Sequence, residues 1–417
     1  MLPVKQAEEV ILGLVQPLDA DEDLEVVDLL TAVGRILAAP VTSQLDFPHW
    51  DNSAMDGYAV RFADVQHCNP QQPVELRIVE EIPAGYQPQC QLQAGQTARI
   101  LTGAVIPMGA DTVIMQEQTR REGDRVLILT APKEVGAFVR HRAAFYQAGM
   151  PLLPAKIKLN AAEIAVLAAA QCTQLSVYRR PRVAILSTGN ELVMPDQTLQ
   201  PGQIVDSNQY ALAAFVAQNG GVPMLLGIVA DQPVALKHAI AQAIESADLV
   251  LSTGGVSVGD YDYIEQSLEE LEGEIHIRAV AVKPGKPLTV ASFPQPQKKS
   301  SVLYFGLPGN PVSALVTAWR FVQPALKKLS GMPESDWQPV FVKARSHQDL
   351  RSDDQRETYL WGYLHLVDGI YQFKLVSGSH SSGNLINLAQ TTGLAMIPVG
   401  KTFIPAGEIV DVLKVVS

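Results

Sequence analysis

Acidic residues, lysines and glycines recur between Arg182 and Leu329 at positions where chemistry could take place. They stand directly after successive short apolar runs, in the order Ser187-Thr-Gly-Asn-Glu191, Asp231, Gly254-Gly255 with Asp260 and Asp262, and Lys283-Pro-Gly-Lys286. Carboxylates and lysines that converge on one rim suit a phosphate-bearing ligand with a hard metal ion. Mg²⁺ typically takes one or two carboxylates together with phosphate oxygens. The sequence therefore predicts a phosphate and Mg²⁺ site.

The segment Pro308-Gly-Asn-Pro311 predicts a helix start that could bind an anion. Asn310 has the side chain of an N-cap, and Pro311 suits the first helical position. Free backbone N–H groups would then point away from the preceding strand and could hold an anion without a side-chain charge. Taken singly, a Gly-Gly pair is more often a tight turn, and an Asp after a strand is more often a helix cap. We favour the site because every connection delivers a polar residue to the same edge.

Alternating strand and helix patterns must position these residues. Four β-branched apolar runs, which predict strands, are Val183–Leu186, Val222–Val229, Asp248–Ser252 and Val302–Gly306, and a fifth predicted strand is Ile275–Val282. Between and after them, helical patterns cover Gln209–Gln218, Val234–Ala247, Tyr261–Leu271 and Pro311–Leu329. These runs are too apolar to have a solvent-exposed face, and they therefore indicate a doubly wound parallel sheet with helices on both sides. Ligands of such sheets bind beyond the carboxyl ends of the strands, where the strand order reverses.

The rest of the chain predicts smaller modules around this α/β domain. Val4–Val15 and Asp28–Ala39 have helical patterns, and a third helix is expected over 161–171 with Asn160 as its cap. Between them lie β-patterned runs at Glu75–Glu80, Thr97–Thr102, Thr112–Glu117 and Arg125–Leu129. From pattern alone, Asp56-Gly57 predicts a hairpin turn; the functional alternative is a carboxylate held on a rigid turn. Residues 338–417 are again β-patterned, as in a small barrel or sandwich.

We therefore expect a multidomain α/β plus β protein. The predicted parts are a discontinuous helical domain (1–46 and 146–178) that forms a dimer, an inserted β-rich module (47–145), a central α/β domain (179–329) and a C-terminal small β-barrel domain (330–417). Because the helices of the central domain already cover its sheet, the N-terminal helices are expected to present their apolar faces to a second subunit.

Composition limits the function classes. The chain has 417 residues and a net charge of −11, without a basic stripe, which excludes a typical nucleic-acid-binding protein. Its three cysteines, Cys68, Cys90 and Cys172, have no zinc or disulfide spacing. No apolar leader or membrane-spanning run is evident, so we expect a cytoplasmic protein without a membrane partner.

Five motifs of the chain resemble those of the molybdopterin molybdenumtransferases, the family that includes the E-domain of gephyrin. They are Asp51-Asn-Ser-Ala-Met-Asp-Gly-Tyr-Ala59, Ser187-Thr-Gly-Asn-Glu-Leu192, Thr253-Gly-Gly-Val-Ser-Val-Gly259 with Asp262-Tyr263, Lys283-Pro-Gly-Lys-Pro287 and Gly306-Leu-Pro-Gly-Asn-Pro-Val-Ser-Ala314. The resemblance covers essentially the whole chain. It implies a four-domain elongated homodimer with its sites in a cleft between subunits. It also implies the reaction, in which molybdate is inserted into adenylylated molybdopterin with Mg²⁺ and AMP is released. A molybdopterin adenylyltransferase would act upstream, and apo-molybdoenzymes would receive the product.

The resemblance assigns roles residue by residue. The implied catalytic residues are Asp56, Glu191, Asp231, Asp262, Lys283 and Lys286, of which Glu191, Asp231 and Asp262 would hold the metal. The implied binding residues are Thr102, Thr188, Gly254, Gly255, Ser257, Pro308, Asn310, Pro311, Arg356 and Ser379, the last in the loop Ser377-Gly-Ser-His-Ser-Ser-Gly383.

Three positions depart from the family pattern. Where the family has Gly-Glu-Asp after an arginine, this chain has Ala143-Ala144-Phe145, so that Phe145 replaces a carboxylate. Ala279 replaces a lysine, with Arg278 beside it, and Trp361 replaces an arginine. Phe145 could stack on a ring of the substrate or could be a core residue. The departures leave an active enzyme as the first hypothesis and a catalytically degenerate molybdopterin-binding or assembly scaffold as the alternative. A third possibility, the single-domain adenylylating enzyme, fits the length and the glycine loop less well.

Overall fold

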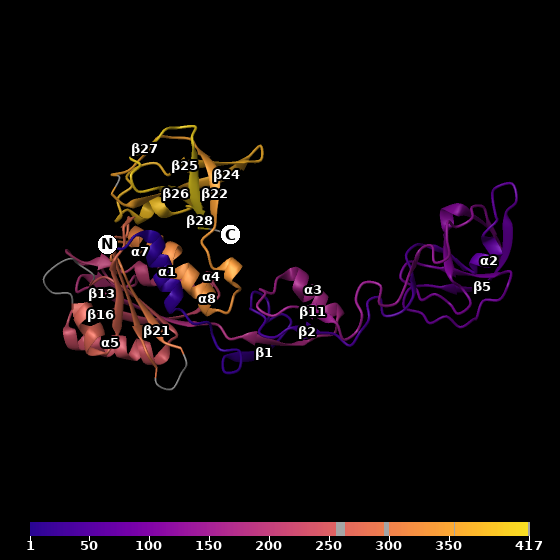
Figure 1. Ribbon diagram of the computed structural model, residues 1–417, viewed down its shortest axis with the longest axis horizontal. Coiled ribbons are helices and arrows are strands. Elements are labelled where there is room, and N and C mark those ends of the chain that lie inside the picture. The colour runs from indigo at the N-terminus through magenta and orange to yellow at the C-terminus, as the bar shows by residue number, and fades with distance from the viewer. Residues whose placement is uncertain (256–262, 296–299, 354, 416–417) are drawn as a thin grey trace. The chain divides into compact units, whose positions relative to one another are not determined.

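The computed structural model describes residues 1–255, 263–295, 300–353 and 355–415 (Figure 1). The chain divides into two compact units. The first comprises Met1–Ala39, Ala155–Ile164 and Gln174–Ser417, and the second comprises Pro40–Pro154 and Ala165–Thr173. The four predicted domain boundaries stay a prediction.

The first unit contains a six-stranded sheet in the order β16-β13-β17-β21-β20-β18. Its strands are β13 (Arg182–Thr188), β16 (Val222–Val229), β17 (Leu249–Thr253), β18 (Glu274–Ala279), β20 (Pro287–Phe293) and β21 (Val302–Leu307). The first four strands of that order are parallel, as predicted. The remaining two strands, β20 and β18, run antiparallel at one edge of this otherwise parallel sheet. Only residues 280–286 connect β18 to β20, and a parallel crossover needs a dozen or more.

Helices cover both faces of this sheet, as the apolar runs predicted. One buried cluster joins the sheet to α1 (Val4–Leu14), α4 (Asn208–Gln218), α7 (Pro311–Thr317) and α8 (Gln323–Leu329). Another joins the opposite face to α5 (Pro233–Ser246) and α6 (Tyr263–Glu270). The helix predicted over 311–329 contains a π-helical turn at Ala318–Val322. Pro324 lies just after this turn and lacks the N–H that an α-helical hydrogen bond would require.

The N-terminal region differs from its prediction in two ways. Helix α1 is present, but Val4, Ala7 and Ile11 are buried in the core that also contains α8, beside which α1 lies in Figure 1. The expectation that this face is free for a second subunit is therefore wrong. No helix covers Asp28–Ala39 either: β1 (Leu24–Asp28) pairs with β12 (Gln174–Tyr178), and a turn follows. The Asp28 carboxylate accepts the N–H groups of Leu30 and Thr31, both at 2.9 Å, and such local bonds compete with a helix.

The C-terminal part of the first unit is a small closed β-barrel, as predicted. Its five strands are β22 (Phe341–Ser346), β24 (Glu357–Val367), β25 (Ile370–Leu375), β26 (Gly393–Ile397) and β28 (Ile409–Lys414). Pairing runs β24-β25-β22-β28-β26 and closes through β26 and β24. Tyr359 and Trp361 of β24 belong to the core cluster of the α/β domain, so the outside of this strand packs against that domain. The short strand β19 (Val282–Lys283) also adds to β24 in parallel.

The second unit contains a six-stranded sheet in the order β7-β4-β6-β5-β9-β8. Four strands confirm the predicted runs: β5 (Val74–Ile82), β6 (Gln96–Ile100), β7 (Thr112–Met115) and β9 (Arg125–Ile128). The strands β4 (Gly57–Val60) and β8 (Thr119–Glu122) were not predicted.

Helix α3 (Ala161–Ala169) begins after Asn160, as expected. Among the described residues, no helix has the length and apolar character needed to span a membrane.

Candidate active site

The strand order places a candidate site between β13 and β17, where the connections leave in opposite directions. Thr188 ends β13, and Gly254 follows β17. Gly254 has φ +87°, and a Cβ atom there would lie 2.2 Å from the Thr188 carbonyl oxygen. The two loops therefore touch through their backbones, which only glycine at this position permits. A Cβ at Gly255 would likewise lie 2.9 Å from Thr188 Oγ1.

Two of the predicted carboxylates lie at this edge. Asn190 N–H donates to Asp231 Oδ2 at 3.3 Å, and Asp231 N–H donates back to Asn190 Oδ1 at 3.2 Å. A Cβ at Gly189 would lie 2.8 Å from both carboxylate oxygens of Glu191, so this side chain folds back over the same loop. The loops after β13 and β16 are thus joined, as the sequence predicted. Asp260, Asp262 and Ser257 lie outside the described residues.

The start of α7 follows the predicted pattern in part. Asn310 occupies the N-cap and Pro311 the first helical position. The Asn310 side chain does not cap the helix but donates to Ser382 Oγ at 3.1 Å. Val312 N–H donates to the Ser382 carbonyl oxygen at 3.2 Å, so the expectation that the N–H groups here are free is wrong for Val312. The barrel loop that contains Ser382 therefore closes over part of the helix start.

Asn208, which sequence reasoning missed, holds the turn before α7 from the other side. Its side chain is buried and donates to the Gly309 carbonyl oxygen at 2.8 Å. The run Asp206-Ser-Asn208 before an apolar helical segment is a helix-start signal that could have drawn attention to it.

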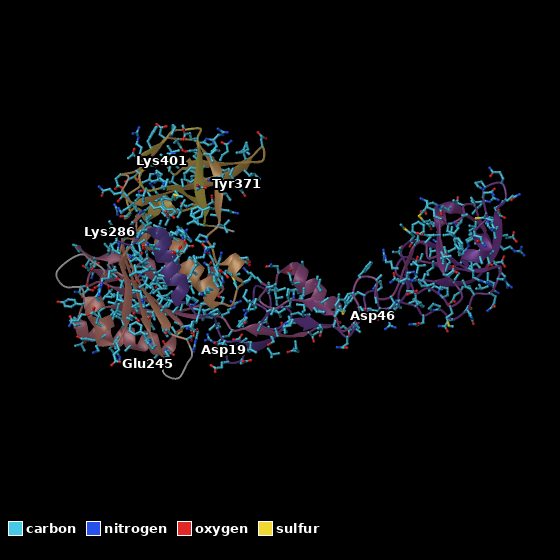
Figure 2. The ribbon with its side chains drawn as sticks, viewed as in Figure 1. Asp19, Asp46, Glu245, Lys286, Tyr371 and Lys401 are labelled. Atoms are coloured by element: carbon cyan, nitrogen blue, oxygen red, sulfur yellow. The ribbon has the colours of Figure 1, made fainter. Side chains whose placement is uncertain are left out.

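The Lys283–Lys286 loop presents two cations on a rigid turn. Val280 N–H donates to the Lys286 carbonyl oxygen at 3.1 Å, which closes the loop. Gly285 packs so closely on α7 that a Cβ would lie 2.5 Å from Thr317 Cγ2. Lys286, labelled in Figure 2, forms no ion pair with any described residue. The loop is therefore anchored at its base and at Gly285.

Asp353, a second residue that sequence reasoning missed, joins Lys283 to Arg356. Its Oδ2 atom lies 2.7 Å from Lys283 Nζ and 3.5 Å from Arg356 Nη2. The hydrogen bond from Lys283, followed by the charges of both cations, lowers the pKa of Asp353. A single carboxylate oxygen thus occupies a position between two cations where the oxygen of another anion could bind.

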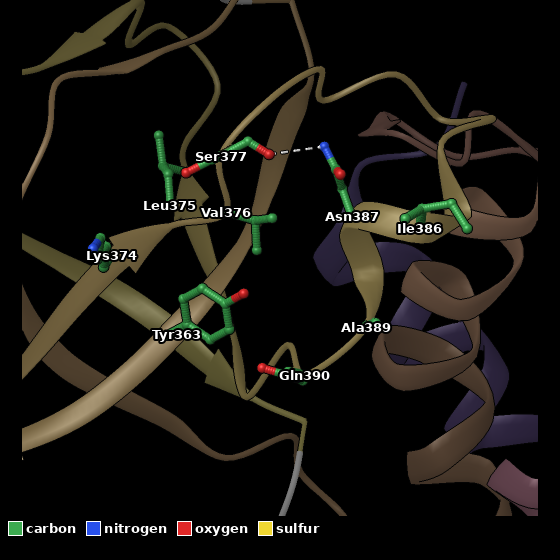
Figure 3. A pocket seen from close by; sticks show the side chains of 9 residues that line it. All are labelled: Tyr363, Lys374, Leu375, Val376, Ser377, Ile386, Asn387, Ala389 and Gln390. Atoms are coloured by element: carbon green, nitrogen blue, oxygen red, sulfur yellow. Dashed lines mark hydrogen bonds between the residues drawn. The ribbon is translucent and has the colours of Figure 1, made fainter.

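The barrel loop with Ser379 is held from two sides. Asn387 donates to the carbonyl oxygens of Ser377 at 3.0 Å and of Ser379 at 3.1 Å, and Figure 3 shows the first of these bonds. The His380 ring lies 4.7 Å from the Trp361 ring, and its Nε2 is 3.0 Å from the Val376 carbonyl oxygen. Because a carbonyl only accepts, Nε2 bears the proton; burial lowers the pKa of His380 and keeps the ring neutral. This pair fixes the loop without adding a charge.

The departures from the family pattern have distinct surroundings. Trp361 is 1 % exposed, packs on His380 and belongs to the core cluster that joins the barrel to the α/β domain. Arg278 does not replace the lysine lost at Ala279, because it pairs with Glu265 and Glu269 of α6. Phe145 is 74 % exposed, so the interpretation as a core residue is wrong.

The backbone supports the alignment at Phe145. Ala143 has φ +62°, a left-handed conformation that favours glycine, and it stands where the family pattern has Gly. A shift of register that would hide a carboxylate nearby is therefore not needed to explain this segment.

In the second unit, Asp56 and Thr102 form a compact pair. Asp56 Oδ1 accepts hydrogen bonds from Thr102 N–H and Thr102 Oγ1, both at 2.7 Å. These bonds lower the pKa of Asp56, with the backbone bond as the larger cause. The hairpin interpretation of Asp56-Gly57 is wrong, because β3 (Asn52–Ser53) and β4 on either side do not pair with each other. Gly57 lies so close to β7 that a Cβ would approach the Ile114 carbonyl oxygen to 1.9 Å.

The donor set at the sheet edge fits a magnesium ion in part. Glu191 and Asp231 supply hard oxygen atoms, the ligands that Mg²⁺ prefers beside substrate phosphates and water. No group of three or more His, Cys, Asp or Glu side chains that could hold a metal occurs in the described part of the chain. Two protein carboxylates are sufficient for a site that is completed by phosphate oxygens.

Comparison with known proteins covers nearly the whole chain. Family models match at residues 2–170 (MoeA N-terminal region, domain I and II), 184–328 (probable molybdopterin binding domain) and 343–415 (MoeA C-terminal region, domain IV). A molybdopterin molybdenumtransferase from Nostoc sp. is 63 % identical over 99 % of this chain and 94 % of that protein. A second, from Haemophilus influenzae, is 34 % identical over 88 % of this chain and 87 % of that protein.

A solved structure has the same fold. It is that of a molybdopterin biosynthesis MoeA protein from Pyrococcus horikoshii, which covers 100 % of both chains with a TM-score of 0.82 and 29 % identity. The rim of carboxylates, the Lys283–Lys286 loop and the Asp56–Thr102 pair therefore occur in a chain that belongs to the molybdopterin molybdenumtransferase family.

Proposed function

We propose that this enzyme of molybdenum cofactor biosynthesis inserts molybdate into adenylylated molybdopterin and releases AMP. Membership of the family supports the activity. The observation that carries the proposal is the position of Asp353 Oδ2 between Lys283 and Arg356. Molybdate and phosphate are tetrahedral oxyanions, and charge-assisted hydrogen bonds from lysine and arginine are among the strongest that such oxygens accept.

The sheet edge would bind the adenylylated substrate. Close backbone contact at Thr188, Gly254 and Gly255 forms its floor, to which Ser257 would add a hydroxyl. The turn Pro308-Gly-Asn-Pro311 would orient the substrate from the neighbouring strand. Glu191 and Asp231, with Asp262, would hold Mg²⁺. When bound, this ion would neutralise charge on the phosphate oxygens during cleavage of the adenylate.

The three cations of the first unit would act on the oxyanion. Lys283, Lys286 and Arg356 would bind molybdate and stabilise charge that develops on phosphate oxygens, and Ser379 would donate from the barrel loop. In the second unit, Asp56, held charged by Thr102, remains a proposed catalytic residue, and a carboxylate in such a role would have to serve through a proton or a metal ion, because it would otherwise repel a phosphate.

We further propose that the enzyme is a cytoplasmic homodimer. It would receive its substrate from a molybdopterin adenylyltransferase and deliver its product to apo-molybdoenzymes. Exposed apolar side chains on β1 and the turn after it support a second copy as partner: Val26 is 69 % exposed, Leu30 82 % and Val33 50 %. A dimer interface that covers these three side chains would be more suitable than one on α1, because the apolar face of α1 is already buried.

An assay of the full-length protein tests the function against the scaffold alternative. Wild-type protein is incubated with adenylylated molybdopterin, molybdate and Mg²⁺, and AMP is measured by chromatography. We expect AMP release that depends on both molybdate and Mg²⁺. Protein that binds adenylylated molybdopterin but never releases AMP would favour the scaffold.

Replacing Phe145 with alanine should weaken substrate binding without loss of stability. An aromatic side chain that is 74 % exposed contributes little to the core, but it can stack on a pterin or adenine ring. We expect the KM for adenylylated molybdopterin to rise about 5-fold, equivalent to about 1 kcal/mol, with an unchanged melting temperature. The control is Met108→Ala, which truncates another apolar side chain of the same unit, 73 % exposed. Equal KM values for the two variants would show that Phe145 does not contribute to substrate binding.

A further inference from the structure

A buried arginine connects three parts of the first unit. Arg320 lies in the π-helical turn between α7 and α8 and is 7 % exposed. Its Nη2 donates to Glu8 Oε2 of α1 at 2.7 Å, and its Nε donates to the Tyr359 hydroxyl of β24 at 3.0 Å. Tyr359 in turn donates to Glu357 Oε1 at 2.5 Å. One guanidinium thus contacts the N-terminal helix and the first residues of the barrel strand.

The protonation states of Arg320 and Tyr359 are fixed by their surroundings. Burial opposes the charge on Arg320, but Tyr359, Glu8 and Glu357 outweigh it and raise the pKa of the guanidinium. Burial raises the pKa of the Tyr359 phenol well above its ordinary value, so that its hydroxyl keeps the proton that it donates to Glu357. Buried ion pairs often contribute little net stability compared with apolar packing, but they impose a geometry. The geometry imposed here is that of β24 relative to α1 and the π-turn.

The same strand holds the two cations proposed to bind the oxyanion. β19 pairs with the start of β24, with Lys283 opposite Thr358, and Glu357 N–H donates to the Ala281 carbonyl oxygen at 3.0 Å. Arg356 directly precedes Glu357. A displacement of Glu357 would therefore also displace Arg356, its neighbour in the chain, and Lys283, whose strand β19 is paired with β24.

The N-terminal segment is hydrogen-bonded to the residues that directly precede the Lys283–Lys286 loop. Leu2 N–H donates to the Ala279 carbonyl oxygen at 2.8 Å, and Ala281 N–H donates to the Leu2 carbonyl oxygen at 2.9 Å. Leu2 precedes α1, which carries Glu8. The ion pair between Glu8 and Arg320 consequently fixes the base of the loop through a second route.

We propose that Arg320 is a positioning residue that sets the distance between Lys283 and Arg356, with Glu8 and Tyr359 as its partners. It acts through the backbone of β24 and of the N-terminal segment and does not touch the substrate itself. The inference rests on the proposed function, in which these two cations bind molybdate. It gives α1 and the π-turn an indirect role in the reaction, although neither element contacts the site.

The variant Tyr359→Phe tests this role, because it removes one hydroxyl and leaves the buried ring in place. Misplaced by a fraction of an ångström, two cations lose much of their joint effect on an anion. We expect the KM for molybdate in the AMP-release assay to rise ~10-fold while kcat changes less than about 3-fold. Glu8→Gln, which breaks the ion pair at the opposite end of the guanidinium, should act in the same direction.

Two further measurements separate positioning from a merely structural role. Tyr363→Phe is the matched control: it alters a tyrosine four residues along β24 that makes no hydrogen bond through its hydroxyl among the described residues, so it should leave KM unchanged. In a Lys283→Ala, Arg356→Ala background, Tyr359→Phe should shift the dissociation constant for inorganic molybdate, measured by titration calorimetry, less than 2-fold. The same substitution in the wild-type background should shift it ~10-fold.

The outcomes distinguish this inference from the proposed function. If wild-type protein binds molybdate but releases no AMP, the proposed function fails, and the calorimetric comparison still tests Arg320. A lower melting temperature for Tyr359→Phe and Glu8→Gln, with unchanged KM and dissociation constant for molybdate, would overturn the positioning role. Wild-type protein that does not bind molybdate at all would overturn it too.

Discussion

Replacing Lys283 with alanine should lower kcat/KM for AMP release by about 100-fold or more, the range expected for the loss of one electrostatic stabiliser. Lys283 lies on a loop anchored by the Val280–Lys286 hydrogen bond and by the close packing of Gly285 on α7. Its ammonium group can therefore meet a developing charge without reorganisation of the loop. A preorganised cation of this kind is more effective than a mobile one.

Stability should change little in the same variant. The side chains of Lys283 and Asp353 are 42 % and 41 % exposed, and exposed ion pairs have small effects on folding. The melting temperature should consequently stay near that of the wild type, which separates a loss of chemistry from a loss of fold.

A matched substitution on the barrel provides the control. Lys343 pairs with Asp411 at 2.7 Å and is 71 % exposed, so Lys343→Ala also removes a surface lysine from an ion pair. We expect wild-type kcat/KM for this variant. AMP release by Lys283→Ala at near wild-type kcat/KM would show that Lys283 does not act on the substrate.

The α/β domain could be predicted because its strands are buried on both faces. All residues of β17 and β21 are buried, so their sequences are mostly apolar and lack the alternation of a strand with one solvent-facing side. The carboxyl ends of such strands then predict where the site lies, and the structure shows that the loops after β13 and β17 meet there, at Thr188 and Gly254.

Other features depend on contacts that no local pattern encodes. The antiparallel edge of the sheet follows from the length of one connection, and the turn after Asp28 follows from a side chain that replaces helical hydrogen bonds. No sequence motif indicated a role for Asp353, because this role depends on contacts with two cations. One of them, Lys283, is 70 residues away in the sequence. The motif at Asp56-Gly57 is typical of a hairpin, whereas its glycine is required by the approach of β7.

The largest effect on stability is expected at Asp248, at the start of β17. Its carboxylate receives two hydrogen bonds from the Arg179 guanidinium, at 2.6 and 2.8 Å, and one from Arg182 N–H at 2.8 Å. Arg179 also pairs with Asp23 at 2.7 Å, so the cluster fixes the β1–β12 ribbon to the base of the sheet. The Asp248 side chain is only 7 % exposed, and removing one partner of a buried pair costs about 3–5 kcal/mol.

Asp248→Asn should therefore lower the free energy of unfolding by about 3 kcal/mol, the lower end of this range, because Asp23 still balances Arg179. Burial alone would raise the pKa of Asp248, but the hydrogen bonds from Arg179 and Arg182 outweigh it and lower the pKa. A carboxylate with a lowered pKa stabilises the fold above its unfolded pKa of about 3.9 and loses this effect as the pH falls through its folded pKa. Calorimetric melting at pH 7 and below pH 4 should thus show a large difference between wild type and variant that shrinks in acid. Glu270→Gln, which breaks the exposed pair with Lys237 on the same domain, should leave the melting temperature nearly unchanged at both values. A difference for Asp248→Asn that persists unchanged in acid would mean that packing, not charge, makes Asp248 important.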